Sequence, residues 1–204
     1  MTRGNRKLPP PDLAKRRVTL TPRRGKYYRC ASISRPLVDW DERSTSRFSS
    51  PGNPVLYLAA SWQTAFYEVF GDNLNDMIPE DRAIAQAELD DRQWVEYEIA
   101  DPLATFDVTD AGSQRQIGAD GATFRVPYGI TQPWALGLHA HPGGIAAMEY
   151  ASRLNDPHLC LAVFGSKPLV AQGQTLFNAR KGLPLSKDPV FLFWLLKTAR
   201  IAVK

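Results

Sequence analysis

The apolar residues of this chain occur in short segments, and this distribution most constrains its fold. Short runs rich in β-branched and aromatic residues, bounded by turn-forming residues, are typical of strands. They predict strands over residues 26–33, 55–58, 93–99, 104–108, 143–150 and 158–165, with a further candidate over 168–177. Because these segments do not alternate regularly with helices, the sequence predicts a single mixed α+β domain rather than a doubly wound parallel sheet.

The segment after residue 60 has the pattern of an amphipathic helix. Ser61 is a suitable N-cap residue. A wide apolar stripe follows at helical spacing, formed by Trp62, Ala65, Phe66, Val69 and Phe70. Glu68 lies at the edge of this stripe, so we expect its carboxylate at the boundary between core and solvent, where a cleft can use it.

Two further helices are predicted, together with two polar segments. Thr131 is the expected N-cap of a helix over residues 131–140, and Asp188 that of a final helix from residue 189 onward. The final helix is so apolar that we expect it to be buried. Residues 34–54 read as a long, turn-rich loop, a type of segment that often carries function. Residues 71–92 read as a loop with a short helix near 81–89.

The positive charge is concentrated at the N-terminus. Residues 1–24 contain eight of the 25 Lys and Arg residues but one of the 21 acidic residues. We therefore divide the chain into a basic arm over residues 1–24 and a domain over 25–204. The arm is interpreted either as a solvated segment or as a contact for nucleic acid or an acidic partner.

Several classes of protein find no support in the sequence. Two cysteines are too few for a disulfide framework, so we expect buried free thiols. The chain has no apolar run long enough to span a membrane and no signal peptide, and we expect a cytoplasmic protein. It has no glycine-rich phosphate-binding motif. His139 and His141 lack a second pair of ligands, so no metal site is predicted, and Cys30 lacks the motif context of a Cys–His nucleophile.

Five polar residues stand among aromatic or turn-forming neighbours and form the candidate site. They are Arg29, Arg47, Tyr57, Glu68 and Ser152. Arg29 lies within an otherwise apolar strand, where a guanidinium needs an anionic partner. That partner is either Glu68, in a structural ion pair, or a ligand phosphate held by the two-pronged guanidinium group.

Three blocks that contain these residues resemble the RES-domain family. They are KYYRCAS (26–32), SRFSSPGNPVLYLAASWQTAFYEV (46–69) and EYASRLNDPHLCLAVFG (149–165), in the order found in the family. The Arg, Glu and Ser that give the family its name correspond to Arg29, Glu68 and Ser152. The chain departs from the family pattern at three positions, with Ser46 and Ser49 in place of Gly and Asn, and Cys30 in place of an aromatic residue. The spacing before Ser152 is also longer than usual.

The resemblance implies a fold similar to the ADP-ribosyltransferases of the diphtheria-toxin kind and a function as a bacterial toxin. Such toxins cleave the nicotinamide–ribose bond of NAD by hydrolysis, or by phosphorolysis with phosphate as acceptor. By resemblance, Arg29 and Arg47 hold the NAD phosphates and Tyr57 lies beside the nicotinamide or its ribose. Glu68 is then the catalytic carboxylate, and Ser152 orients Glu68 or NAD.

The resemblance also implies a partner and leaves two alternatives open. The expected partner is an antitoxin with a helix-turn-helix-type domain that covers the active site, and any DNA contact is through it. NAD is the substrate, and no metal is expected. The first alternative is a protein ADP-ribosyltransferase that uses the same site. The second is a nucleic-acid-binding module that uses the basic arm.

Overall fold

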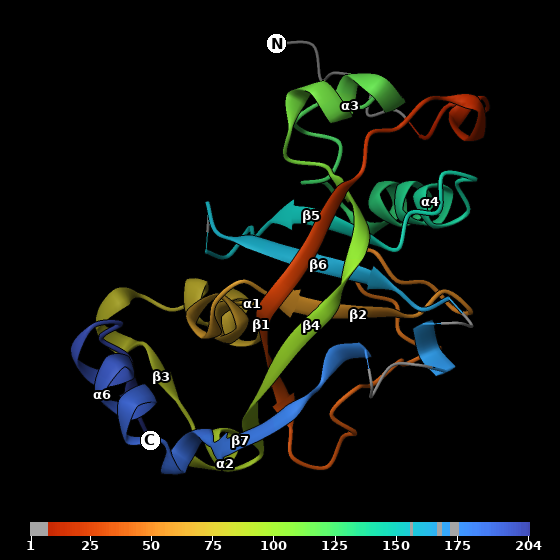
Figure 1. Cartoon of the computed structure of the whole chain (residues 1–204). Coiled ribbons are helices and arrows are strands. Elements are labelled where there is room, and N and C mark those ends of the chain that lie inside the picture. Colours follow the sequence, from red (N-terminus) through yellow and green to blue (C-terminus); the bar gives the residue numbers. More distant parts are fainter. Residues whose placement is uncertain (1–7, 156, 167–168, 172–175) are drawn as a thin grey trace.

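The chain folds around one curved sheet (Figure 1). The computed structural model describes residues 8–155, 157–166, 169–171 and 176–204. The sheet has the strand order β1-β2-β6-β5-β4-β7, and β1 also pairs with β4. Its strands are β1 (Thr21–Ser32), β2 (Val55–Ala59), β4 (Arg92–Asp107), β5 (Ala147–Ala151), β6 (Leu159–Phe164) and β7 (Arg180–Pro184). The β1–β4 pairing closes the first five strands of this order into a barrel-like ring. The predicted mixed α and β domain is confirmed, whereas the closure of its sheet was not predicted.

Side chains from all five strands of the ring form an interior core. The β4–β5 pair is parallel, and the other pairs in the ring are antiparallel. Because successive side chains alternate between the two faces of a strand, every second residue points inward. The buried members of this inner cluster are Tyr27, Ala31, Leu56, Leu58, Val95, Tyr97, Ile99, Leu103, Ala147, Leu161, Val163 and Phe177. Their neighbours Tyr28, Cys30, Tyr57 and Ala59 belong to a second cluster on the outer face.

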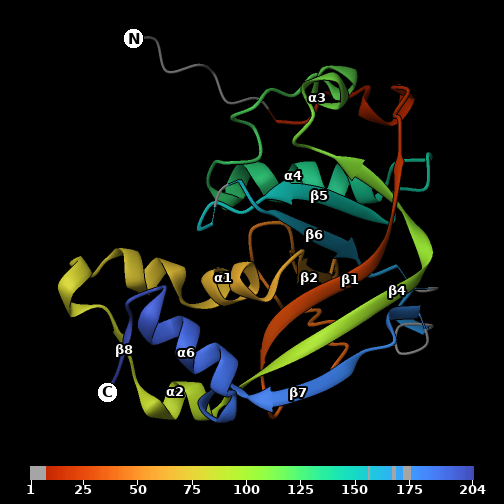
Figure 2. The same ribbon diagram turned by 60° about the vertical axis from the view of Figure 1, so that its left-hand side comes forward.

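The main helices cover the outer face of the ring. They are α1 (Trp62–Asn75), α4 (Tyr128–His139) and α6 (Pro189–Lys197), each of which contributes buried residues to the outer cluster. Figure 2 shows α6 lying beside α1, away from α4. The smaller elements are α2 (Gln86–Asp90), α3 (Ala111–Ile117), the 3-10 turns η1 (Leu13–Lys15), η2 (Pro79–Asp81) and η3 (Leu185–Lys187), and a parallel pair of β3 (Ala83–Ile84) with β8 (Ala202–Val203).

Several of the sequence predictions are confirmed. Ser61 caps α1, and its hydroxyl accepts a hydrogen bond from the Thr64 amide. Asp188 caps α6 in the same way through the amides of Val190 and Phe191. The strands expected over 26–33, 55–58, 143–150 and 158–165 correspond to β1, β2, β5 and β6. Local signals located these elements because caps and side-chain periodicity act within a few residues.

Other strand and helix predictions were wrong in detail. The strands predicted over 93–99 and 104–108 are one long strand, β4, because β1 pairs along its whole length with a bulge between Arg23 and Gly25. Residues 169–171 and 176–177 are helical rather than extended, and the rest of the predicted 168–177 strand lies outside the described residues. Thr131 is not an N-cap. The helix α4 begins after Pro127, and the buried Thr131 hydroxyl instead donates to the Arg47 carbonyl.

The final helix is only half buried, contrary to the sequence prediction. Phe191 and Leu195 face the core. Val190 is 70% exposed and Phe193 is 67% exposed. Because α6 packs on α1 from the outside, its far side has no other element of the described chain to pack against.

The N-terminal segment packs partly against the domain. Leu13 is buried and lies against Gly137 of α4. Residues 21–24, which the sequence assigns to the basic arm, form the start of β1. Arg16 pairs with Asp12, and Arg23 pairs with the buried Glu149. No helix in the described part of the chain is both long and apolar enough to cross a membrane.

Candidate active site

Glu68 and Ser152 meet at the junction of α1 and the end of β5. The Ser152 hydroxyl donates a hydrogen bond of 2.5 Å to Glu68 Oε1. Ser152 is buried, whereas Glu68 is exposed to solvent. One carboxylate oxygen is therefore fixed by a buried hydroxyl while the group remains accessible to a ligand.

The turn that carries Ser152 is attached to α1 at two levels. The Ser152 Oγ accepts hydrogen bonds from the amides of Leu154 and Asn155 at 3.2 and 3.0 Å. The Asn155 side chain donates to the Thr64 hydroxyl at 3.0 Å. About two helical turns further along α1, the Ser152 turn meets Gly71, where a Cβ atom would lie 3.1 Å from Leu154 Cβ. These contacts hold the Ser152 hydroxyl in a fixed position relative to Glu68.

Arg47 lies buried in the long loop between β1 and β2 and is 9% exposed. Its guanidinium carbon lies 4.8 Å from the Phe48 ring centroid and 5.2 Å from that of Tyr150, and Nη2 donates to the Phe124 carbonyl. Burial lowers the pKa of Arg47, while the nearby Tyr150 and Glu68 act in the opposite direction. Within the described residues, no carboxylate lies within ion-pair distance of this guanidinium. A buried cation of this kind is suited to an anionic ligand.

The serines that replace the expected Gly and Asn organise the same loop. The Ser46 amide donates to Ser49 Oγ at 3.0 Å, and Ser44 Oγ lies 3.0 Å from Ser46 Oγ and 2.9 Å from Ser49 Oγ. Ser49 is fully buried. Hydroxyl groups therefore supply the hydrogen bonds that hold the loop next to Arg47.

Tyr57 supports this loop from β2. Its hydroxyl accepts a hydrogen bond of 2.9 Å from the Phe48 amide, and its ring stacks on Phe48 at a centroid distance of 6.4 Å. Burial raises the pKa of Tyr57 to about 12. The phenol is thus a neutral group that fixes the loop and also lines the pocket described next.

A pocket of about 240 Å³ brings these residues together between α1, the outer face of the sheet and the loop at residue 47. Arg47, Tyr57 and Glu68 all line it. Three residues that sequence reasoning did not single out, Tyr128, Tyr150 and Arg153, line it as well. Arg153 directly follows Ser152, so its position in the quoted motif was an available signal. Tyr150 stands in the same quoted motif, two residues before Ser152, whereas nothing in the local sequence marked Tyr128.

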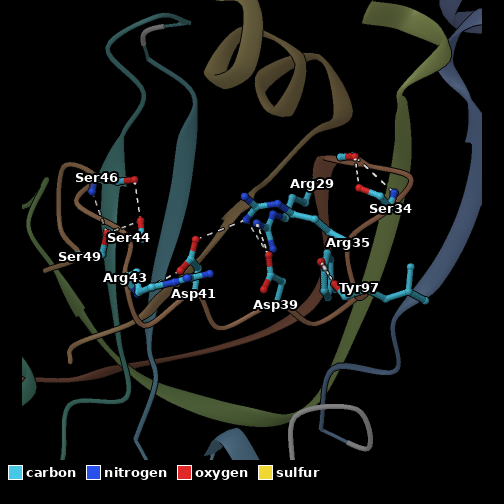
Figure 3. Close-up of polar contacts among 12 residues, drawn as sticks. Arg29, Ser34, Arg35, Asp39, Asp41, Arg43, Ser44, Ser46, Ser49 and Tyr97 are labelled. Atoms are coloured by element: carbon cyan, nitrogen blue, oxygen red, sulfur yellow. Dashed lines mark hydrogen bonds and ion pairs between the residues drawn. The ribbon is translucent and has the colours of Figure 1, made fainter. Parts of the chain in front are cut away.

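Arg29 borders the same pocket, but its guanidinium interacts with a residue that is not part of the candidate site. Figure 3 shows Arg29 and Arg35 pointing toward Asp39 in the loop after β1. Arg29 Nη2 lies 3.9 Å from Asp39 Oδ2, and Arg35 Nη1 lies 2.9 Å from the same oxygen. The ion-pair partner of Arg29 is therefore Asp39 and not Glu68. Since Tyr28 and Cys30 face outward, strand alternation directs Arg29 toward the ring interior, beside Tyr97. The Nη1 atom of Arg29 is buried and has no hydrogen-bond partner among the residues that the structure describes.

Two buried cysteines, Cys30 and Cys160, lie on the wall of the pocket. Burial raises the pKa of both thiols, to about 12 for Cys30. Within the described residues, no group of three His, Cys, Asp or Glu side chains has the arrangement of a metal site. The chemistry that the pocket offers is that of a carboxylate, a buried guanidinium and neutral aromatic walls.

Comparison with models of protein families identifies the family of this chain. The model of the RES domain matches residues 17–184. The chain belongs to the RES-domain family. The matched region of this RES-domain protein contains all five candidate residues and ends at β7, before α6 and β8.

One solved structure similar to this RES-domain protein is a chain of the M. tuberculosis MbcT–MbcA toxin–antitoxin complex. The two chains are 17% identical, and the alignment covers 81% of this chain and 87% of that one with a TM-score of 0.57. At this level of identity, the similarity establishes a shared fold. No curated protein matches the sequence.

Proposed function

We propose that this protein is the toxin of a toxin–antitoxin pair and that it cleaves the nicotinamide–ribose bond of NAD. Membership of the RES-domain family and the shared fold with a chain of a toxin–antitoxin complex support this proposal. The observation that carries it is the contact between Ser152 and Glu68 at the edge of a pocket that also contains Arg47.

The proposed chemistry requires a fixed negative charge beside a ribose. The nicotinamide–ribose bond breaks through a transition state with oxocarbenium character, as in glycoside cleavage. Nicotinamide leaves as a neutral molecule, so a strong general acid is not needed. A preorganised carboxylate stabilises the positive charge that develops on the ribose. Glu68 meets this requirement because Ser152 holds Oε1 and leaves Oε2 available to the ribose.

The other residues of the pocket would bind the rest of NAD. Arg47 is buried, has no carboxylate partner in the described part of the chain, and is suited to a phosphate of the dinucleotide. Arg29 would join it by leaving Asp39 and turning from the ring interior toward the pocket, where a phosphate would also satisfy its Nη1 atom. Tyr57 and its neighbour Tyr150 offer aromatic faces to the nicotinamide or its ribose.

We further infer that the fold is related to the ADP-ribosyltransferases and that an antitoxin with a helix-turn-helix-type domain covers the pocket. A free enzyme that destroys NAD would harm the cell that makes it, so such an activity requires an inhibitor. Ion pairs already engage Arg16 and Arg23 of the N-terminal segment, which makes nucleic-acid binding by this segment the weaker proposal.

The test is to incubate the purified protein with NAD, with and without phosphate, and to separate the products by chromatography. Release of nicotinamide is the expected result. ADP-ribose as second product would indicate hydrolysis, and a phosphorylated ADP-ribose would indicate phosphorolysis. If nicotinamide appears only when protein is added as acceptor, and label from NAD stays on that protein, the activity is ADP-ribosylation. No release under any of these conditions would overturn the proposal.

A further inference from the structure

Arg153 is a third arginine at the Glu68 pocket, beside Arg29 and Arg47, and was not among the candidates from the sequence. It follows Ser152 in the turn after β5 and lines the pocket together with Glu68 and Asp72. Its backbone is held by the hydrogen bonds of the Ser152 turn. Its side chain is 47% exposed, so the guanidinium can move while its attachment point stays fixed.

The ion pair that holds the Arg153 side chain, formed with Asp72, is weak. Arg153 Nη2 lies 2.7 Å from Asp72 Oδ2, and the Asp72 side chain is 64% exposed. Ion pairs between exposed side chains contribute little because water screens the charges and both side chains lose freedom. A ligand phosphate that competes for this guanidinium therefore displaces a weak contact.

The surroundings of Arg153 favour an anion. Arg153 is close enough to Arg47 for its positive charge to oppose the charge of Arg47. Two like charges at one pocket repel each other, and an anionic group bound between them relieves that repulsion. A pyrophosphate carries two negative charges and accepts hydrogen bonds from two guanidinium groups.

The position of Asp72 also indicates that Arg153 is available to an anionic ligand. Asp72 lies one helical turn after Glu68 on α1, so both carboxylates face the pocket. Ser152 holds Glu68, whereas the partner of Asp72 is the movable Arg153. Asp72 thus forms an ion pair with the Arg153 guanidinium when no ligand is bound.

We propose that Arg153 binds the pyrophosphate of the dinucleotide substrate together with Arg47, and that Asp72 holds Arg153 in the empty pocket and is exchanged for the phosphate. This inference rests on the proposed function for the identity of the substrate. It adds a residue that was not among the five candidates from the sequence.

The experiment compares the binding of ADP and of adenosine by calorimetry in the wild type, Arg153→Gln and Asp72→Asn. Arg153→Gln should weaken ADP binding about tenfold and leave adenosine binding unchanged, since it removes one contact between charged groups. Asp72→Asn should strengthen ADP binding because it removes the competing carboxylate. Lys26→Gln is the matched control, as Lys26 is also exposed and ion-paired, at 3.1 Å to Glu96, but does not line the pocket.

The same variants should be tested for turnover of NAD. Arg153→Gln should raise KM more than it lowers kcat, because the contact lies away from the bond that breaks. If ADP binding changes as expected but the wild type does not cleave NAD, the proposed function fails and the role of Arg153 stands. If NAD is cleaved but Arg153→Gln alters neither ADP affinity nor KM, the role of Arg153 is refuted. Absence of ADP binding by the wild type, or weaker binding by Asp72→Asn, would also overturn it.

Discussion

Ser152 and Glu68 are separated by 84 positions in the sequence, and the hydroxyl of the first donates a hydrogen bond of 2.5 Å to the carboxylate of the second. This bond joins the end of β5 to the middle of α1. It uses one carboxylate oxygen and leaves the pocket side of Glu68 open.

Glu68→Gln should strongly reduce nicotinamide release while the protein stays folded. The substitution keeps an acceptor for Ser152 but removes the negative charge, and loss of one preorganised group in an electrostatic site typically lowers the rate about 100- to 1,000-fold. The rate of nicotinamide release and the thermal unfolding temperature are the measurements. Glu80→Gln is the control, because Glu80 is also exposed and does not line the pocket. Wild-type turnover by Glu68→Gln would refute the role of the carboxylate.

Ser152→Ala should reduce both stability and activity. It removes the donor to Glu68 and leaves the amides of Leu154 and Asn155 without their acceptor, which costs about 1–3 kcal/mol in the free energy of unfolding. Asn155→Ala is the comparison, since it removes the tether to Thr64 but keeps the contact with Glu68. Urea unfolding and kcat should be measured for both variants.

Comparison of Ser152→Ala with Asn155→Ala separates a positioning role of Ser152 from a structural one. We expect Ser152→Ala to lower kcat more than Asn155→Ala for the same loss of stability. In a Glu68→Gln background the further loss from Ser152→Ala should shrink, because the two residues act through one contact. Equal losses of kcat in both backgrounds would mean that Ser152 acts independently of Glu68.

Glu149 should make stability depend on pH. It is buried and accepts a hydrogen bond from Arg23, with Asp107 3.8 Å from the same guanidinium. Burial raises the pKa of Glu149 above its ordinary value of 4.5, although Arg23 opposes the shift. A carboxyl group with a higher pKa in the folded state binds more protons when folded, so its contribution to stability is present below the unfolded pKa and lost as pH rises through the folded pKa.

Glu149→Gln removes this titration and keeps an acceptor for Arg23. The free energy of unfolding of the wild type should therefore fall relative to that of the variant as pH rises above 4.5. Urea unfolding at a series of pH values measures the difference. A wild type that gains stability over the variant in this range would contradict the direction of the shift.

The two faces of α6 should respond differently to truncation. Phe191 is 1% exposed and contacts the rings of Trp62, Phe66 and Trp94, whereas Phe193 is 67% exposed. Phe191→Ala should cost about 3–5 kcal/mol of unfolding free energy because it leaves a cavity. Phe193→Ala should cost less than about 0.5 kcal/mol. Chemical denaturation of both variants checks this, and equal costs would show that the exposed face is covered.

The pocket cysteines should react slowly in the folded protein. Burial raises the pKa of Cys30 to about 12 and also raises that of Cys160, so at pH 8 little of the reactive thiolate is present. A thiol-specific chromogenic reagent should modify both residues rapidly only after denaturant is added. Rapid modification of the native protein would mean that the pocket wall opens to solvent.

The sequence by itself determined the features that depend on near neighbours. Ser61 and Asp188 cap their helices because an N-cap bond closes within three residues. The short apolar segments located most strands because side chains alternate at fixed spacing. Three quoted blocks also indicated the RES-domain family, although no local pattern could show how those blocks meet.

Tertiary structure alone decided which side chains share a site. Closure of the ring through β1 and β4 turns Arg29 toward Asp39, while the turn at Ser152 brings Arg153 to the pocket. The packing of α6 on α1 also leaves one face of α6 exposed, although the sequence of that helix is apolar from Pro189 to Leu196. These outcomes depend on contacts between residues distant in the chain, and the physical reason is that burial and ion pairing follow from which elements pack together, whereas periodicity and capping are local.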